Sequence, residues 1–429
     1  MKLKHLSFAA CLLVAALATS STVRAQSGTI KIGILHSLSG TMAISETTLK
    51  DTILMLIDEQ NKKGGLLGRK LEAVVVDPAS DWPLFAEKAR ELLEKDKVAV
   101  VFGCWTSVSR KSVLPVFEKD NGLLFYPVQY EGEESSKNVI YTGAAPNQQA
   151  IPAVDYLMKD LAVKRWVLEG TDYVYPRTTN KVLEAYLKSK GVAAADISIN
   201  YTPFGHSDWQ TRVAAIKRFG SAGKKTAVVS TINGDANVPF YKELGNQKVS
   251  AEDIPVVAFS VGEEELSGLD TKPLVGHLAA WNYFQSVKTP ANTAFIQKWK
   301  TYIKKPNRTT NDPMEAHYIG FNLWVKAVEK AKTVEVEKVL AALPGLETPN
   351  LTGGMAKLLP NHHITKPVYI GEVRADGQFD VVSKTPGTVP GDAWSDYLPV
   401  SQDTEADWVT LKCGNYNTKT KKCSGQNYK

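Results

Sequence analysis

The feature that most constrains this chain is an alternation of short apolar segments with amphipathic helical segments, which occurs in two separate series. In the first series, residues 30–35 are predicted as a strand, and residues 48–61 carry apolar side chains on one helical face. Further strands are predicted at 71–76, 98–102 and 123–126, and further helices at 82–95 and 107–119. Strands that alternate with helices in this way form a parallel, doubly wound sheet. The first series therefore predicts one α/β lobe.

A second series restarts after residue 150 and predicts a second lobe. Helices are predicted at 151–159, 178–190, 208–219 and 239–244, and strands at 165–169, 196–201, 227–230 and 255–259. The segment 143–147 is the predicted first crossover between the lobes, and the segment 276–285 looks like a return. No unit of 20–50 residues repeats, which excludes a solenoid. A chain of 429 residues is long enough to bury two such cores.

The first 25 residues have the pattern of a cleavable signal peptide. Lys2 and Lys4 precede an apolar run at 8–18, and the small residues of 23–25 offer a cleavage site. The run is too short to span a bilayer, and no later segment has 18 consecutive apolar residues. Cleavage removes three basic residues and no acidic ones, which lowers the formal charge from +6 to +3. The sequence therefore predicts a periplasmic protein with no direct membrane insertion and no nucleic-acid partner.

The cysteines and histidines give no catalytic or metal-binding pattern. Cys413 and Cys423 lie close together in a polar tail and are predicted to pair, because the periplasm permits disulfides. Cys104 directly follows an apolar strand, and we interpret it as a small, inert residue. The neighbouring His362 and His363 would point in opposite directions on a strand, so we interpret them as structural. The chain has no P-loop and no G-x-G-x-x-G after a strand, and neither a metal nor a cofactor is predicted.

Motifs spread over nearly the whole mature chain resemble those of urea-transport binding proteins. They include VFGCWTSVSRKSVLPVFE (101–118), YPVQYEG (126–132), YTGAAPNQQ (141–149), TDYVYPR (171–177), INGDANVPF (232–240), VGEEEL (261–266), AAWNYFQSV (279–287) and PNHHITK (360–366). The amide-sensing receptors of amidase operons share the GC-aromatic-x-S turn and the YPRxxN-type segment. The tail after Pro399 is less similar to this family.

This resemblance implies the α/β fold of the type I periplasmic binding proteins, with two doubly wound lobes joined by three crossovers. It also implies that ABC permease membrane subunits are the protein partners. The expected division is a signal peptide (1–25), lobe 1 (26–145 and 278–350), lobe 2 (146–277 and 351–398, with a hairpin) and a disulfide-bonded tail (399–429).

The candidate ligand site consists of residues that follow predicted strands, because ligands of open α/β sheets bind at the carboxyl ends of strands. The turn at 103–107 enters a helix whose first backbone N–H groups, with the Ser107 hydroxyl, would face a ligand carbonyl. Ser107 is equally suited to a plain N-cap, and the two roles are compatible. Aromatic side chains would wall a small, planar, polar molecule, although singly each is as often a core residue.

Urea offers four N–H donors and one carbonyl acceptor, so its pocket must be rich in acceptors. Asp235 and the run Glu263-Glu264-Glu265 follow strands and supply carboxylates, although such a run is commonly a solvated face. The resemblance favours Glu263 and Glu265. The full set of predicted ligand-binding residues is Trp105, Thr106, Ser107, Tyr126, Val128, Gln129, Tyr173, Tyr175, Asp235, Glu263, Glu265 and Phe284.

These observations predict a binding protein that holds urea or a short-chain amide between two closing lobes and delivers it to a permease. A branched-chain amino-acid binder of the same fold is an alternative, but it would need a cation or oriented N–H groups for the ligand carboxylate. An amidohydrolase would use Cys104 as its nucleophile, but no histidine is positioned beside it by the sequence. A cytoplasmic ligand-sensing regulator is disfavoured by the signal peptide.

Overall fold

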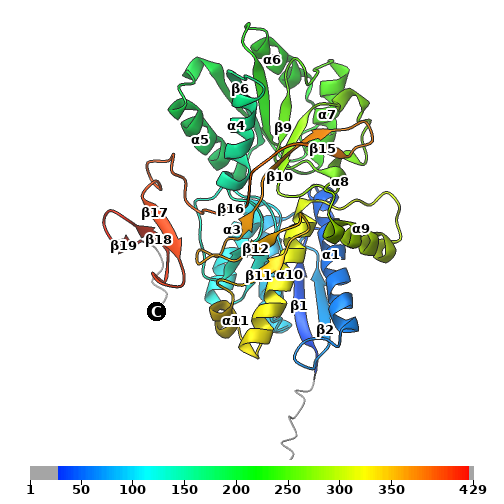
Figure 1. Ribbon diagram of the computed structural model, residues 1–429, viewed down its shortest axis with the longest axis vertical. Coiled ribbons are helices and arrows are strands. Elements are labelled where there is room, and N and C mark those ends of the chain that lie inside the picture. Colours follow the sequence, from blue (N-terminus) through cyan, green and yellow to red (C-terminus); the bar gives the residue numbers. More distant parts are fainter. Residues whose placement is uncertain (1–27, 425–429) are drawn as a thin grey trace, which may run out of the picture.

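The computed structural model describes residues 28–424, and the predicted signal peptide lies outside them. Two α/β lobes stand one above the other (Figure 1). The sheet of lobe 1 has the order β2-β1-β3-β4-β5, and all of its neighbouring strands are parallel. Its strands are β1 (Ile30–Leu35), β2 (Leu71–Val76), β3 (Val100–Gly103), β4 (Leu124–Tyr126) and β5 (Val139–Tyr141). This arrangement confirms the first predicted lobe.

Helices cover both faces of the lobe 1 sheet, so that its strands are apolar on both sides. One core cluster joins the sheet to α1 and α10, and the other joins it to α2 and α3. The helices of this lobe are α1 (Ala43–Lys62), α2 (Trp82–Arg90), α3 (Ser107–Lys119), α9 (Pro290–Ile303), α10 (Asp312–Ala331) and α11 (Val336–Ala342).

Lobe 2 contains a seven-stranded mixed sheet in the order β15-β14-β10-β9-β8-β6-β7. The parallel strands are β6 (Arg165–Thr171), β7 (Ile197–Thr202), β8 (Thr226–Thr231), β9 (Val256–Ala258) and β10 (Leu278–Trp281). The antiparallel pair is β14 (Tyr369–Val373) and β15 (Phe379–Lys384). Its helices are α4 (Ala150–Lys159), α5 (Val174–Ser189), α6 (Gln210–Gly220), α7 (Asn237–Asn246) and α8 (Glu263–Leu266).

The lobe boundaries after residue 277 differ from the expected ones in two places. Residues 278–281, expected in lobe 1, form β10 and pair with β9 and β14 inside the lobe 2 sheet. Residues 351–364, expected in lobe 2, pack on lobe 1, where Leu358 and Ile364 belong to the core. The side chains that anchor both segments are buried and apolar, and such residues do not say which of two similar lobes will receive them.

Side-chain amides bind the crossovers to one another. The first crossover contains Gln148, just before α4; the second contains Asn282, just after β10; and the third contains Pro367, just before β14. The Asn282 amide donates to the carbonyl oxygens of Gln148 (3.0 Å) and Pro367 (2.7 Å). The Gln149 amide donates to the carbonyl oxygens of Phe259 (3.1 Å) and Ala280 (2.7 Å) in lobe 2. These bonds satisfy backbone carbonyls that the sheets do not pair, and they hold the three crossovers together where the lobes must hinge.

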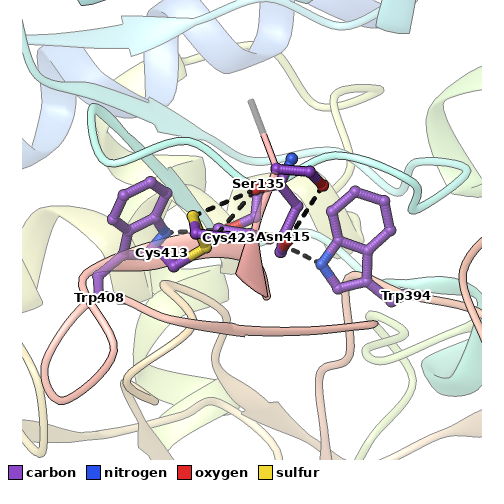
Figure 2. Close-up of a disulfide and its surroundings, with 8 residues drawn as sticks. Ser135, Trp394, Trp408, Cys413, Asn415 and Cys423 are labelled. Atoms are coloured by element: carbon purple, nitrogen blue, oxygen red, sulfur yellow. Dashed lines mark hydrogen bonds between the residues drawn. A yellow bond between two sulfur atoms is a disulfide. The ribbon is translucent and has the colours of Figure 1, made fainter. Parts of the chain in front are cut away.

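The tail forms a small three-stranded antiparallel sheet beside lobe 1 (Figures 1 and 2). Its strands are β17 (Thr404–Asp407), β18 (Cys413–Asn417) and β19 (Lys422–Cys423), and the disulfide Cys413–Cys423 is formed as predicted. The Trp408 indole donates to Ser135 Oγ (2.9 Å), and the Trp394 indole donates to the Gly414 carbonyl oxygen (2.8 Å). Trp408 thus attaches the tail to the loop after β4, and Trp394 joins the tail to the segment that precedes it.

Replacing Cys413 and Cys423 together by serine is expected to destabilise the tail locally by about 3 kcal/mol, the loop-closure entropy of a ring of this size. The exposed lysines at 419–422 should then be cleaved faster by trypsin, while the lobes melt at an unchanged temperature. Limited proteolysis with mass spectrometry, together with a thermal melt, measures both effects. Reduced wild-type protein is the matched control, and equal cleavage rates in oxidised wild type and the variant would contradict the expectation.

Candidate functional site

The two lobes are closed on each other along the loops that follow their strands. The Trp105 indole of lobe 1 donates to Asn233 Oδ1 of lobe 2 (3.2 Å), and the Gln129 amide donates to Ser260 Oγ (2.6 Å). The Asp235 backbone N–H donates to the Thr41 carbonyl oxygen (3.1 Å). Trp105 and Gln129 of the predicted set therefore lie where the strand-end loops of the two lobes meet, and this contact region is the candidate ligand cleft.

The turn that enters α3 is tightly constrained. A Cβ on Gly103 would lie 2.4 Å from the Leu35 carbonyl oxygen, so only glycine fits where β3 ends beside β1. Cys104 takes a left-handed conformation with φ of +65°. Thr106 is the N-cap, because its hydroxyl accepts from the Ser109 N–H (3.1 Å). Ser107 is therefore the first helical residue rather than the cap, which leaves its hydroxyl for other contacts.

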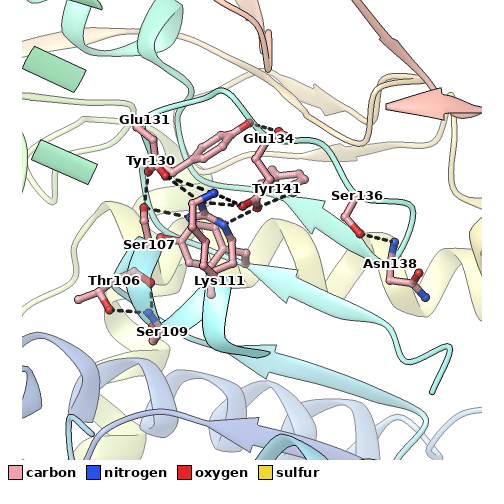
Figure 3. Close-up of polar contacts among 12 residues, drawn as sticks. Thr106, Ser107, Ser109, Lys111, Tyr130, Glu131, Glu134, Ser136, Asn138 and Tyr141 are labelled. Carbon is pink, nitrogen blue, oxygen red and sulfur yellow. Dashed lines mark hydrogen bonds and ion pairs between the residues drawn. The ribbon is translucent and has the colours of Figure 1, made fainter. Parts of the chain in front are cut away.

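Ser107 belongs to a buried network of charged side chains (Figure 3). Its hydroxyl donates to the Glu131 carboxylate and accepts from Arg110 Nη1 (3.1 Å). Arg110 also contacts Glu131 (3.2 Å) and Glu134 (2.7 Å), and Lys111 contacts Glu134 (2.7 Å). Burial raises the pKa of Glu134, but the charges of Arg110 and Lys111 outweigh it and set the pKa at about 2. The four charged side chains balance one another.

Sequence reasoning missed the charged members of this network. Arg110 and Glu131 stand inside the family-like motifs at 101–118 and 126–132, yet neither was selected. Arg110 has no exposure to water, and its guanidinium lies 4.8 Å from the ring centres of both Tyr126 and Tyr130. The sequence around Arg110 gave little signal, because its neighbours Ser109, Lys111 and Ser112 are polar and are typical of an exposed helical face.

Four of the predicted aromatic residues are buried, two in each lobe. Trp105 and Tyr126 of lobe 1 are buried, and the Tyr126 hydroxyl donates to the Trp105 carbonyl oxygen. Tyr173 and Tyr175 of lobe 2 are also buried, with ring centres 6.1 Å apart. The pKa of Tyr173 is raised mainly by burial and further by Tyr126 and Tyr175. Thr106, Val128 and Gln129 complete the lobe 1 side.

Two polar atoms in this region are buried without a hydrogen bond of good geometry, although they belong to neighbouring side chains. They are the Gln129 amide oxygen and the Tyr175 hydroxyl, one from each lobe. Burial raises the pKa of the Tyr175 hydroxyl, and the neighbouring Gln129 and Ser260 side chains oppose that effect. A buried polar group without a partner costs on the order of 1–3 kcal/mol. The pair therefore marks a place where a polar ligand atom gains hydrogen bonds.

The other predicted ligand residues are not brought into this cleft. Phe284 packs in the core of lobe 2 against Phe379, with ring centres 4.8 Å apart, because Gly371 leaves room for its ring. The Asp235 side chain is exposed, and its backbone rather than its carboxylate meets lobe 1.

The glutamates at 263–265 have partners on lobe 1 and the second crossover. Glu263 accepts from the Gln285 N–H (2.6 Å), Glu264 pairs with Arg308 (2.6 Å), and Glu265 accepts from the Ser45 hydroxyl (2.7 Å). Ser45 lies on α1, so α8 connects lobe 2 to lobe 1. These carboxylates hold the closed lobes instead of offering free acceptors.

The buried cysteine and histidines lie within packed structure. Cys104 has no exposure, and burial raises the pKa of its thiol, which agrees with an inert role. His363 stacks on Tyr141 with ring centres 4.6 Å apart, and burial lowers the pKa of both His362 and His363 to about 4.

Within residues 28–424, no group of three or more His, Cys, Asp or Glu side chains is arranged to hold a metal ion. No helix in that range has the length and apolar character needed to cross a bilayer.

Comparison with known proteins assigns the family. A family model described as a periplasmic binding protein domain matches residues 30–400. This chain belongs to that family. The match covers both lobes and the crossovers between them, and it confirms the two-lobed α/β fold that the sequence predicted. The family consists of binding proteins and not of enzymes.

Similar curated proteins are mainly amino-acid binders. The Leu/Ile/Val-binding protein homolog 7 of Brucella melitensis is 26% identical over 346 residues, 75% of this chain and 82% of that protein. The Leu/Ile/Val-binding protein BraC3 of Rhizobium johnstonii is 28% identical over 208 residues, 48% of this chain and 55% of that protein. A stretch of 124 residues is 29% identical to a limonene hydroxylase of Geobacillus stearothermophilus, of which it covers 22%.

Solved structures share the fold. A Rhodopseudomonas palustris solute-binding protein in complex with 4-hydroxybenzoate has a TM-score of 0.71 and 20% identity, covering 84% of this chain and 98% of that one. A leucine-binding protein of Thermotoga maritima has a TM-score of 0.67 and 16% identity, covering 83% and 98%. At these identities the likeness concerns the fold alone.

Glu263 generates a pH-dependent prediction. Burial raises the pKa of its carboxyl from 4.5 to about 8, with Glu265 and Asp312 adding to the rise. Between those values the unfolded chain ionises this carboxyl while the folded protein keeps it neutral, so wild-type stability falls as the pH rises. Glu263→Gln keeps an acceptor for the Gln285 N–H without this penalty. We expect the variant to have a higher free energy of unfolding than wild type at pH 8. The difference should grow by on the order of 1.4 kcal/mol for each pH unit between the two pKa values.

Guanidinium unfolding at pH 4 and at pH 8 measures this difference. At pH 4 the carboxyl is protonated in both the folded and the unfolded chain, so the titration no longer separates variant from wild type. A stability difference of the same size at both pH values would contradict the assignment.

Proposed function

We propose that this chain is the periplasmic solute-binding protein of an ABC importer and that it binds urea or a short-chain amide between its lobes. The observation that carries the proposal is a pair of buried polar atoms from opposite lobes, the Gln129 amide oxygen and the Tyr175 hydroxyl, which lie close to each other without forming a well-shaped hydrogen bond. One is an acceptor and the other is a donor. A small amide has both matching groups, because its N–H bonds to the acceptor and its carbonyl oxygen accepts from the hydroxyl.

The charges around α3 favour a neutral ligand. The relatives named above for Leu, Ile and Val, and the structure with 4-hydroxybenzoate, concern ligands that carry a carboxylate. A carboxylate needs a cation or free N–H donors. At this end of the cleft the guanidinium of Arg110 is already used by Glu131, Glu134 and Ser107. A neutral amide needs no such cation.

Closure of the lobes supplies the transport mechanism. Gln129 lies on lobe 1 and Tyr175 on lobe 2, so a ligand that bonds to both stabilises the closed state over the open one. The crossovers joined by Asn282 are the natural hinge. The closed pair of lobes then presents one surface to the permease subunits.

A branched-chain amino-acid binder is the second candidate, and the similarity to Leu/Ile/Val-binding proteins favours it. Calorimetric titration of the purified protein with urea, acetamide and leucine separates the two. We expect heats of binding with urea or acetamide and none with leucine. Leucine binding without any response to the amides would overturn the proposed ligand class, and ammonia release from urea would point to an amidohydrolase instead.

Tyr175→Phe is expected to weaken urea or acetamide binding about tenfold, the value of one hydrogen bond. The thermal stability should stay the same or rise, because the lost hydroxyl makes no hydrogen bond of good geometry in the folded protein. Tyr241→Phe, at a buried tyrosine in the core of the same lobe, is the matched control and should leave affinity unchanged. Equal affinities of wild type and Tyr175→Phe would remove Tyr175 from the site.

A further inference from the structure

We infer that Glu131 is a specificity-determining residue of the ligand site, where its carboxylate accepts N–H groups from the ligand and repels ligands that carry a carboxylate. This inference rests on the proposed function and names a residue outside the predicted set of ligand-binding residues. Four structural observations support it: the direction of the side chain, the hydrogen-bond state of Ser107, the distribution of charge around Arg110, and the contacts of neighbouring residues with lobe 2.

The side chain of Glu131 is directed to the start of α3. Glu131 is 1% exposed and lies in the loop after β4, opposite Ser107 (Figure 3). The preceding Tyr130 bonds on the other side, where its hydroxyl meets the Glu134 carbonyl oxygen (3.0 Å) and His363 (2.7 Å). Gly132 follows with φ of +71°, which turns the chain away directly after Glu131.

The hydrogen bond between Ser107 and Glu131 determines whether the Ser107 hydroxyl can act as a donor or as an acceptor toward a ligand. A hydroxyl has one proton, and that of Ser107 is donated to Glu131. Ser107 already accepts from Arg110 Nη1, and its remaining lone pair can only accept. The expected role of this hydroxyl as a donor to a ligand carbonyl is therefore replaced by an acceptor role. Together, Ser107 and Glu131 make this end of the cleft rich in acceptors.

The two glutamates on Arg110 differ in how fully they are neutralised. Glu134 has both Arg110 and Lys111 at 2.7 Å, and it also accepts from the Tyr141 hydroxyl (2.9 Å). Glu131 lies 3.2 Å from Arg110 and 4.0 Å from Lys111. The negative charge of Glu131 is thus less fully neutralised by nearby cations than that of Glu134. Glu131 is also the carboxylate that bonds to Ser107.

The loops that carry Glu131 and Ser107 meet lobe 2. Gln129, two residues before Glu131, donates to Ser260 Oγ of lobe 2 (2.6 Å), and Trp105, two residues before Ser107, donates to Asn233 Oδ1 (3.2 Å). A ligand held where these loops meet lobe 2 would therefore lie near the carboxylate. An N–H donor there forms a charge-assisted hydrogen bond, about twice as strong as a neutral one. An anionic ligand would meet a like charge in a buried site instead.

Acetamide and acetate are a matched pair of probes, because they share a shape and differ in charge and in N–H groups. We expect wild type to bind acetamide and to bind acetate at least tenfold more weakly. In Glu131→Gln the ratio of the two affinities should fall at least tenfold, with acetate gaining and acetamide losing. Isothermal titration calorimetry of each ligand gives the ratio, and thermal unfolding reports stability.

Glu134→Gln is the matched control, since it removes the same charge from the same arginine on the side away from Ser107. Its stability should fall while the acetamide-to-acetate ratio stays within twofold of wild type. A merely structural role for Glu131 would make both variants lose stability and affinity together and leave the ratio unchanged. An unchanged ratio in Glu131→Gln, or an equal change in both variants, would overturn the inference.

The outcomes also separate this inference from the proposed function. If wild type binds neither urea nor acetamide, the proposed function fails, and the acetate titrations alone then decide the role of Glu131. At least tenfold tighter acetate binding by Glu131→Gln than by wild type and Glu134→Gln would still support carboxylate exclusion. Acetate binding that is unchanged by Glu131→Gln would overturn it.

Discussion

The binding side of lobe 1 depends on one requirement, which is that the charge of a fully buried guanidinium must be compensated. Removing a partner from such a buried pair costs on the order of 3–5 kcal/mol, so the neighbours of Arg110 are not free to vary independently. Glu131 and Glu134 come from the loop after β4, and Ser107 comes from the start of the same helix. The rings of Tyr126 and Tyr130 lie over the guanidinium. The residues that neutralise Arg110 therefore contribute both to the stability of lobe 1 and to the proposed ligand preference.

Sequence reasoning recovered the two lobes because parallel strands are apolar on both faces and stand out between amphipathic helices. It brought Trp105, Tyr126 and Tyr175 to one cleft because each follows a strand. It failed for Glu263 and Glu265, whose partners on α1 and the second crossover are far away in the sequence. Glu131 was missed for the same reason, since its importance comes from Arg110, 21 residues earlier in the chain.

Several of the contacts that close the lobes are polar, and they stand beside an aromatic contact between Trp82 of lobe 1 and Phe204 of lobe 2. Trp105 bonds to Asn233, Gln129 bonds to Ser260, and α8 bonds to α1 through carboxylates. Each such bond replaces bonds to water and gains only about 1 kcal/mol. An interface of this kind leaves open and closed states near in free energy, so the few bonds that a small ligand can make are enough to decide between them.

The tail has a consequence for the thermodynamics of binding. The loop that carries Glu131 is bonded on its outer side to the tail, where the Glu133 carboxylate accepts from the Ser395 N–H (3.0 Å) and the Ser401 hydroxyl (3.0 Å). The disulfide-bonded sheet therefore orders this loop before any ligand arrives. A relative without such a tail would have to order the loop during binding, and the difference would be seen as a less favourable entropy of association with the same contacts in the cleft.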